Sequence, residues 1–266
     1  MRTGEPDVVR IGRLTPDMAL TGHAQVTRTL GAEILSGVHP PGANLPAEAE
    51  LLSRFQVSRT VLREVLKTLS AKGLIASKTR VGTRVLDPSR WNFFDPEILA
   101  WKVGLGLDAE FRTNLTEIRQ AIEPLAAELA ASRCSKAQIR ELRARVDAMR
   151  SLEHDRQSFA EADLQFHLAI GHASGNPLIR SIAGVIEAAL VASFSLSSPT
   201  DDPELQASTV AKHEAIVDAI EAGDAAAARS AMLAVIEAGA RRTGSSGKAK
   251  ARSAGAPKQR KARATP

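Results

Sequence analysis

The segment from residue 108 to residue 242 constrains the fold most, because it is helical throughout. Apolar residues recur there at the spacing of one face of a helix. Glycine, proline and clustered polar residues break this pattern at 175–177, at 197–203 and at 223–224. The helices that the pattern predicts are 109–132, 136–152, 156–173, 178–197, 204–222 and 225–242. Short breaks between long amphipathic helices predict an all-α antiparallel helical bundle over residues 108–242.

Residues 21–87 have a different pattern, of three short helices followed by a small β-hairpin. The first helix carries Val26, Leu30 and Ile34 on one face, the second lies in LPAEAELLSRF, and the third runs from Thr60 to Lys72. Two β-like runs in LIASKTRVGTRVL then flank a glycine-containing turn. The chain is therefore predicted to be mainly α, with an N-terminal winged helix-turn-helix before the bundle.

The third helix presents a row of cations. Arg59, Arg63 and Lys67 are four residues apart, on a different side from the apolar residues, and Ser58 fits an N-cap. A short helix, a tight turn and a donor-rich second helix form a helix-turn-helix, whose second helix can enter the major groove. Arginine suits guanine, because its planar fork matches two acceptors. Such a row can also simply face solvent, but here a helix, a turn and a basic hairpin accompany it.

The hairpin adds Lys78, Arg80 and Arg84, which would let it reach the DNA backbone or the minor groove as a wing. The predicted DNA-binding residues are therefore Ser58, Arg59, Thr60, Arg63, Lys67, Lys78, Arg80, Gly82, Thr83 and Arg84.

The charge of the chain is unevenly distributed. The net charge is +5, yet residues 241–266 hold nine Lys and Arg and no acid, which leaves 26 basic and 30 acidic residues elsewhere. DNA binding by the folded part must therefore come from a local patch. The basic end, 243–266, is of low complexity and is expected to be disordered. It is either a plain solvated extension or a nonspecific DNA tether.

Other features concern organisation and compartment. Residues 1–20 are expected to be a disordered extension, and residues 88–107 a linker that docks on the folded parts. The single cysteine, Cys134, cannot form an internal disulfide, and is expected to be structural. No apolar run is long enough for a membrane span or a signal peptide. These features predict a cytoplasmic protein without membrane contact.

Four polar residues lie on apolar helical faces of the bundle. Asp163 and His167 are four residues apart within an inward stripe, His213 shares a face with isoleucine and valine, and Arg119 lies among leucines and isoleucines. Burying an unpaired ion is costly, so these groups should meet each other, a metal or a bound anion. One Asp and two His suit a divalent metal such as zinc, and a nearby guanidinium suits a carboxylate. Internal pairing without metal would also satisfy them, and an isolated histidine on an apolar face is often a core residue.

The segment LPAEAELLSRFQVSRTVLREVLKTLSAKGLI resembles the winged-helix domain of the GntR family of bacterial repressors. The resemblance implies that Ser58, Arg59, Thr60 and Arg63 occupy DNA-contact positions, and that Gly82 and Thr83 occupy the wing tip. Many members have arginine where this chain has Ala49, so the operator preference is expected to differ.

The segments EADLQFH, SGNP and KHEAIVDAIEAGDAAAARSAM resemble the all-α FCD effector domain of the FadR branch of that family. Many such domains bind a divalent metal through one Asp and three His. Asp163, His167 and His213 match three of these, but Val235 stands where the fourth is expected. The resemblance also implies an effector site at Arg119, Asp163, His167, Asn176 and His213, and RWNFFDPEILAW favours a sugar-acid-responsive subgroup.

The leading hypothesis is a transcriptional regulator that is not an enzyme. A homodimer would read a palindromic operator in double-stranded DNA, under the control of a small carboxylate, and would act as a repressor. A metal-dependent enzyme is the second hypothesis, with Glu123 or Glu161 as candidate bases only by proximity. An architectural DNA-binding protein that works through the basic tail is the third.

Overall fold

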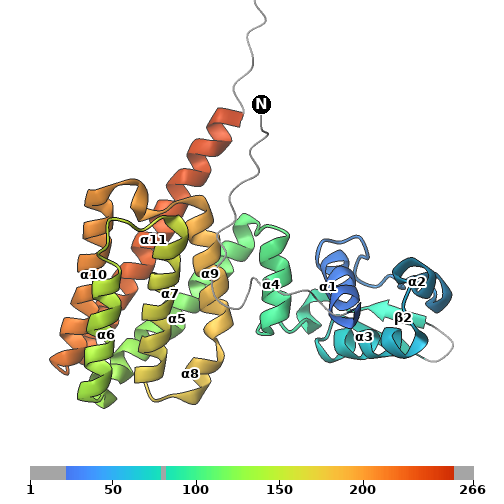
Figure 1. Ribbon diagram of the computed structural model, residues 1–266, viewed down its shortest axis with the longest axis horizontal. Coiled ribbons are helices and arrows are strands. Elements are labelled where there is room, and N and C mark those ends of the chain that lie inside the picture. Colours follow the sequence, from blue (N-terminus) through green and yellow to red (C-terminus); the bar gives the residue numbers. More distant parts are fainter. Residues whose placement is uncertain (1–21, 79–81, 255–266) are drawn as a thin grey trace, which may run out of the picture.

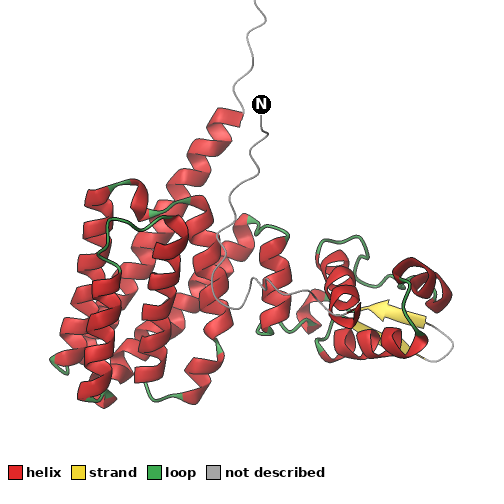
Figure 2. Ribbon diagram, in the orientation of Figure 1, coloured by secondary structure: helices red, strands yellow, loops and turns green. Residues whose placement is uncertain are grey.

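The computed structural model describes residues 22–78 and 82–254 as an N-terminal winged unit joined by a short helix to a helical bundle (Figure 1). The winged unit consists of α1 (Gly22–Leu35), α2 (Glu48–Phe55), α3 (Arg59–Ala71), β1 (Ile75–Lys78) and β2 (Gly82–Val85). Figure 2 shows the strands in this unit, with the bundle built from helices. The mainly α architecture predicted from the sequence is confirmed.

The turn between α2 and α3 is fixed at both of its ends. Gln56 ends α2 in the left-handed conformation at φ 51°, and the Ser58 side chain accepts a hydrogen bond from Val61 N to begin α3. Leu62, Val65 and Leu69 then form a buried face on α3, which packs against α1. Because that face is anchored in the core, the opposite side of α3 is presented to solvent.

The wing is stabilised by the chain that connects α1 to α2. Ile75 pairs with Val85 and Lys78 with Gly82 in an antiparallel register. On the other side of β2, Leu45 N donates to Thr83 O at 2.8 Å and Val85 N donates to Ala43 O at 2.9 Å. The hairpin is therefore held on both edges of β2.

The predicted linker contains η1 (Pro88–Arg90) and α4 (Pro96–Gly104). Ile98 and Trp101 of α4 are buried in the core of the winged unit, whereas Leu99 and Val103 are buried in the core of the bundle. The helix therefore belongs to both cores. The sequence analysis expected residues 88–107 to dock on the folded parts, and α4 lies in this range.

The bundle is built around α9. It comprises α5 (Ala109–Arg133), α6 (Lys136–Ala148), α7 (Arg156–Ala173), α8 (Pro177–Ser181), α9 (Ala183–Leu196), η2 (Pro199–Asp201), α10 (Pro203–Glu221) and α11 (Ala225–Ala254). α9 contacts α4, α5, α7 and α11, and its residues Ile186, Leu190 and Phe194 are buried. A helix that is apolar on nearly all sides is typical of a buried position.

Three predicted helix ranges differ from the structure by more than two residues, and the first of them, 136–152, ends at Ala148. The predicted helix 178–197 is divided into α8 and α9 at Ile182, whose φ of −93° and ψ of 9° depart from helical values. The last helix does not end at 242 but continues to Ala254, so the expectation of disorder from residue 243 is wrong for 243–254. Alanine, lysine and arginine are strong helix formers and can continue a helix without a buried face. Residues 1–21 and 255–266, the rest of the predicted disordered ends, lie outside the described residues.

Of the helices in the described part of the chain, none combines the length and the hydropathy that a membrane span requires.

Candidate functional site

The exposed side of α3 carries the predicted DNA-contact arginines. The Arg59 side chain is 79% exposed, and its Nε lies 4.0 Å from Glu48 Oε1, at the limit of an ion pair. Arg63 and Thr60 are exposed as well. Lys67 is exposed but paired with Glu64 at 2.7 Å on the same helix. Surface pairs of this kind are weak, so the arginines remain available to an incoming duplex.

The wing residues are described in part. Gly82 has φ 100°, a conformation that favours glycine, and Thr83 Oγ1 lies 3.0 Å from Ser77 Oγ across the hairpin. Arg84 is exposed, although its Nε donates to Gly42 O at 2.7 Å, so this guanidinium also fixes the loop before α2. The side chain of Lys78 and the whole of Arg80 lie outside the described residues.

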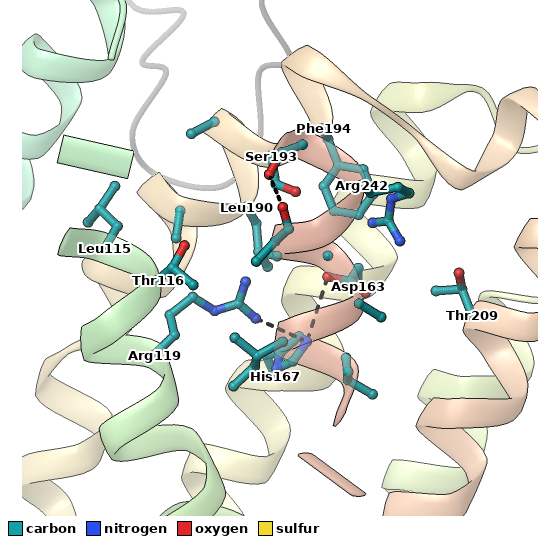
Figure 3. Close-up of a pocket in the computed structure, with 18 of the residues that line it drawn as sticks. Leu115, Thr116, Arg119, Asp163, His167, Leu190, Ser193, Phe194, Thr209 and Arg242 are labelled. Atoms are coloured by element: carbon teal, nitrogen blue, oxygen red, sulfur yellow. Dashed lines mark hydrogen bonds and ion pairs between the residues drawn. The ribbon is translucent and has the colours of Figure 1, made fainter. Parts of the chain in front are cut away.

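A cavity in the bundle brings together residues from five helices (Figure 3). Its empty volume is about 720 Å³, including the part open to solvent. Polar residues that line it are Arg112, Thr116 and Arg119 of α5, Asp163 and His167 of α7, Ser193 of α9, Thr209, Lys212 and His213 of α10, and Arg242 and Thr243 of α11. The four polar residues singled out in the sequence of the bundle therefore meet in one place.

Asp163, His167 and His213, which we call the Asp–His cluster, are at most 4% exposed and offer three ligand atoms within 4.8 Å of one another. His213 Nε2 lies 3.1 Å from Asp163 Oδ1, and His167 Nε2 lies 3.7 Å from Asp163 Oδ2. Figure 3 shows His167 between Arg119 and Asp163. Both Nε2 atoms thus face one carboxylate.

Neighbouring acceptors fix the orientation of both imidazoles. His213 Nδ1 donates to the Thr209 carbonyl at 2.8 Å, and His167 Nδ1 contacts the Glu123 carboxylate. Because a carbonyl or a carboxylate can only accept, these contacts favour a proton on each Nδ1 and leave each Nε2 facing Asp163. A second acceptor of this kind behind each ligating histidine is typical of metal sites in proteins.

Arg119 and Glu123 form a buried ion pair one turn apart on α5. Arg119 Nε contacts Glu123 Oε1, and Arg119 Nη2 lies 3.4 Å from Glu123 Oε2. The same Nη2 lies 3.5 Å from His167 Nε2. A buried guanidinium and a buried carboxylate are tolerable because they neutralise each other.

The pKa values follow from these neighbours. Burial alone would raise the pKa of Glu123, but the charges of Arg119 and His167 outweigh it and lower the pKa to about 2. Burial likewise opposes ionisation of Asp163, but a hydrogen bond from His213 and the charges of His167, His213 and Arg119 bring its pKa to about 2. Both carboxylates are therefore anionic at neutral pH, as metal ligands or their supporting groups must be.

The Asp–His cluster fits a divalent metal such as zinc. His213 Nε2 and the Asp163 carboxylate are both buried and lie 3.1 Å apart. A lone pair that faces a carboxylate is unfavourable unless a cation or a proton lies between them. Three protein ligands would leave open coordination positions for ligand oxygens. Val235, where the fourth ligand was expected, lines the cavity and offers no donor.

One predicted effector residue is not part of this cavity. Asn176 caps α8, where its Oδ1 accepts a hydrogen bond from Leu178 N at 3.0 Å, and it does not line the cavity. This asparagine before Pro177 serves as a helix cap, so the structure does not bring it together with the other predicted effector residues. Glu161, a candidate base, accepts from Gln165 at 2.7 Å and does not line the cavity either.

The sequence analysis missed three contributors to the site. Glu123, assigned there only as a candidate base, is recognisable as a partner by its spacing of four residues from Arg119. The carbonyl of Thr209 leaves no signal in a side-chain pattern. Arg242 was assigned to the end of the last predicted helix, next to the basic tail, but it lines the cavity.

The fold and the site together define a class of protein: a winged-helix DNA-binding unit attached to an all-α domain with a polar ligand cavity. Residues 23–85 match the family model described as bacterial regulatory proteins, gntR family, and residues 114–238 match the FCD domain. The chain belongs to the GntR family of transcriptional regulators and carries an FCD effector-binding domain, so it belongs to a family of regulators and not of enzymes.

Similar proteins agree with this assignment. The galactonate operon transcriptional repressor of Escherichia coli is 32% identical over 225 residues, which cover 85% of this chain and 98% of the repressor. The regulator LutR of Bacillus subtilis is 31% identical over 208 residues, covering 76% of this chain and 91% of LutR. Among solved structures, Lar, which controls the agr system of Listeria monocytogenes, shares the fold at a TM-score of 0.56 and 20% identity, covering 86% of this chain and 99% of that one. Regulators of this family bind DNA and small effectors and typically form dimers.

Proposed function

We propose that the protein is a repressor that binds a palindromic operator as a homodimer, and that a small organic acid in the bundle cavity controls it. A sugar acid is the effector class that we favour, because the galactonate operon repressor of Escherichia coli aligns over almost its whole length. The protein then acts where its operator is, in the bacterial nucleoid.

The observation that carries the effector assignment is the buried polar group at the cavity. Arg119, Glu123 and the Asp–His cluster are each at most 8% exposed, yet several of them line a space that opens to solvent. Polar atoms that converge on an apolar pocket are typical of a ligand site. Arg119 would bind the carboxylate of the acid, and Asp163, His167 and His213 would hold a divalent metal that polarises its oxygens.

The operator would be read by α3. Arg59 and Arg63 would contact base edges, Ser58 and Thr60 would contact phosphates or bases, and the wing would contact the backbone through the residues around Gly82 and Thr83. In a dimer, the two winged units would contact operator half-sites about one turn of the DNA helix apart.

The cavity is connected to the DNA-binding unit through α9 and α4. Leu190 and Ser193 of α9 line the cavity, and Gly184 at the other end of the same helix contacts Leu99 and Pro96 of α4. An acid that binds more tightly to one position of α9 would shift α4 and, with it, the winged unit. The change in operator affinity cannot exceed the difference between the affinities of the acid for the two positions of α9.

The DNA half of the proposal is tested with Arg59→Ala and Arg63→Ala, measured by operator binding against a scrambled duplex. Each variant should lose ~1–3 kcal/mol of discrimination, the worth of one bidentate base contact. Arg140→Ala removes an exposed cation from α6 and should leave discrimination unchanged. Sequence-independent binding that is unaffected by either head variant would favour an architectural protein instead.

The effector half is tested by thermal shift with D-galactonate and a panel of other aldonic and uronic acids, followed by operator release. An acid at 100 times its dissociation constant should add about 2.7 kcal/mol to the free energy of unfolding. Arg119→Lys keeps a positive charge beside Glu123 but loses the planar guanidinium that can donate two parallel hydrogen bonds to a carboxylate. This variant should bind the acid more weakly and the operator normally. An Arg119→Lys protein that still releases DNA at the wild-type acid concentration would show that the acid binds elsewhere.

A further inference from the structure

The last helix contributes a guanidinium to the cavity. Arg242 of α11 lines the cavity together with Val235 and Gly239. Seven residues are close to two helical turns, so Arg242 lies on the same face as Val235 and further from the start of the helix. The residues between them on that face, Ala238 and Gly239, are small.

The Arg242 side chain lies over the preceding turn of α11. A β-carbon on Gly239 would be 4.0 Å from Arg242 Nη2, which places the guanidinium beside residue 239. Side chains on a helix lean toward its N-terminus, so this is the expected direction. The charged group therefore extends toward the level of Val235, the position that lacks the fourth metal ligand.

The guanidinium is also within electrostatic reach of the Asp–His cluster. Burial lowers the pKa of Arg242, and the negative charge of Asp163 partly opposes this shift. In the view of Figure 3, Arg242 lies beside Phe194, and Arg119 lies on the opposite side of Asp163. The cavity thus has Arg112 and Arg119 from α5, Lys212 from α10 and Arg242 from α11 among its lining residues.

Arg119 and Arg242 reach the cavity from different helices. Arg119 already binds Glu123 through two of its nitrogens. Arg242 lines the same cavity, as do Phe194 and Thr243. An anion in the cavity would have both guanidinium groups among the residues around it.

We propose that Arg242 is an anion-binding residue of the effector site, and that in this chain its guanidinium takes the place beside Asp163 that a fourth metal ligand would occupy. The proposal rests on the proposed function of the cavity as an acid-binding site. Its ligand is an acid whose carboxylate reaches Arg242 while its hydroxyl oxygens face Asp163 and the two imidazoles. Such an acid links α11 to α7 and α10.

Two measurements on the full-length protein test this, with Arg242→Met as the variant and Arg241→Met as the matched control. Arg241 is the adjacent residue of α11, its side chain is 69% exposed, and it pairs with Glu237 at 3.3 Å. The first measurement is the affinity for D-galactonate and for the most stabilising acid of the panel. The second is the affinity for Zn²⁺ alone, by competition with a chromophoric chelator.

The two affinities should change in opposite directions. Loss of the charged fork should weaken acid binding about tenfold or more, since a charge-assisted hydrogen bond is lost. Removing a cation beside Asp163 should tighten Zn²⁺ binding several-fold, because like charges repel. The control should change neither affinity by more than about twofold. A residue with a purely structural role would weaken both.

The outcomes separate this proposal from the one on which it rests. If no acid binds wild-type protein, the effector assignment fails, and the Zn²⁺ measurement alone decides the role of Arg242. Val235→His, which supplies a fourth donor, should then raise Zn²⁺ affinity more when it is combined with Arg242→Met than when Arg242 is retained. The proposal is overturned if Arg242→Met, with an unchanged circular dichroism spectrum, binds the acid as wild type does or binds Zn²⁺ no more tightly. Arg242→Lys, which keeps the charge, guards against loss of folding and should give intermediate acid affinity.

Discussion

Trp101 of α4 packs directly against Gly31 of α1, so closely that a β-carbon on residue 31 would lie 2.3 Å from the ring carbon Cζ3. Only glycine permits this approach. The contact joins the first helix of the DNA-binding unit to the helix that also belongs to the core of the bundle.

Gly31→Ala should therefore separate α1 from α4. Overpacking costs ~1–3 kcal/mol, against a gain of up to ~1 kcal/mol in helix propensity, so the variant should be less stable in urea. The acid should also change its operator affinity less than it does in wild type. Gly104→Ala in α4 is the control, since nothing lies within 4 Å of a β-carbon there. Equal midpoints for the two variants would mean that the α1–α4 contact adapts freely.

Lys72→Met should destabilise the protein by ~1–3 kcal/mol, because charge-assisted hydrogen bonds are lost. Lys72 follows α3, and its Nζ lies 2.8 Å from Asp95 and 2.6 Å from Glu97 of the α4 region. Urea unfolding at pH 8 measures the effect. Lys67→Met removes a surface pair and should cost close to nothing.

The effect of Lys72 should disappear at high pH. Burial lowers the pKa of Lys72, but Asp95 and Glu97 outweigh it and raise the pKa above 10.5. A raised pKa in the folded state stabilises below the unfolded value, and this stabilisation is lost as pH rises through the folded value. The difference between wild type and Lys72→Met should therefore be full at pH 8 and shrink above about pH 10.5. A difference that persists there would point to packing on Trp101 instead of charge.

Much of this architecture is readable from the sequence because local signals agree with the tertiary contacts. α7 occupies the predicted range Arg156–Ala173, since Asp155 caps its start and Gly175 follows its end. The division at Ile182 was missed because no glycine or proline marks it. The neighbouring Gly184 packs against Pro96 and Leu99 of α4, a contact between segments far apart in the sequence.

Site residues could be predicted where a polar side chain interrupts an apolar helical face. Other site residues could not be found from the sequence. Asp163, His167, His213 and Arg119 were found in this way, and the structure places all four at one cavity. Arg242 is the last residue of the predicted helix 225–242, beyond its last large apolar residue, so periodicity gave no reason to place it at the cavity. Its role depends on the length of α11 and on the small residue at 239, which no local pattern reveals.

Glu123→Gln should weaken Zn²⁺ binding by about 10–100-fold, the usual effect of losing the acceptor behind a ligating histidine. The Glu123 carboxylate contacts His167 Nδ1, so an amide would no longer fix which nitrogen carries the proton. Calorimetry with Zn²⁺ checks this, and Glu128→Gln, at a surface pair with Arg229, is the control. Unchanged Zn²⁺ affinity in a folded Glu123→Gln protein would mean that His167 is not a metal ligand.

A protein that ends at Thr243 should bind any duplex with a shallower dependence on salt. Residues 244–266 hold seven Lys and Arg and no acid, and each phosphate neutralised adds about −0.9 to the slope of log affinity against log salt. This truncation keeps Arg242, so acid binding should be unaffected. Identical slopes for the two proteins would show that the basic end is a solvated extension.

The shared helix α4 sets a limit on dissecting the molecule. A fragment that stops before it would leave a hole where Ile98 and Trp101 belong, and a fragment that keeps it would display Leu99 and Val103 to water. Neither half is a self-sufficient module. Exchanging heads between relatives should succeed only when the recombination point lies after residue 104 and the new surface of α4 suits the host bundle.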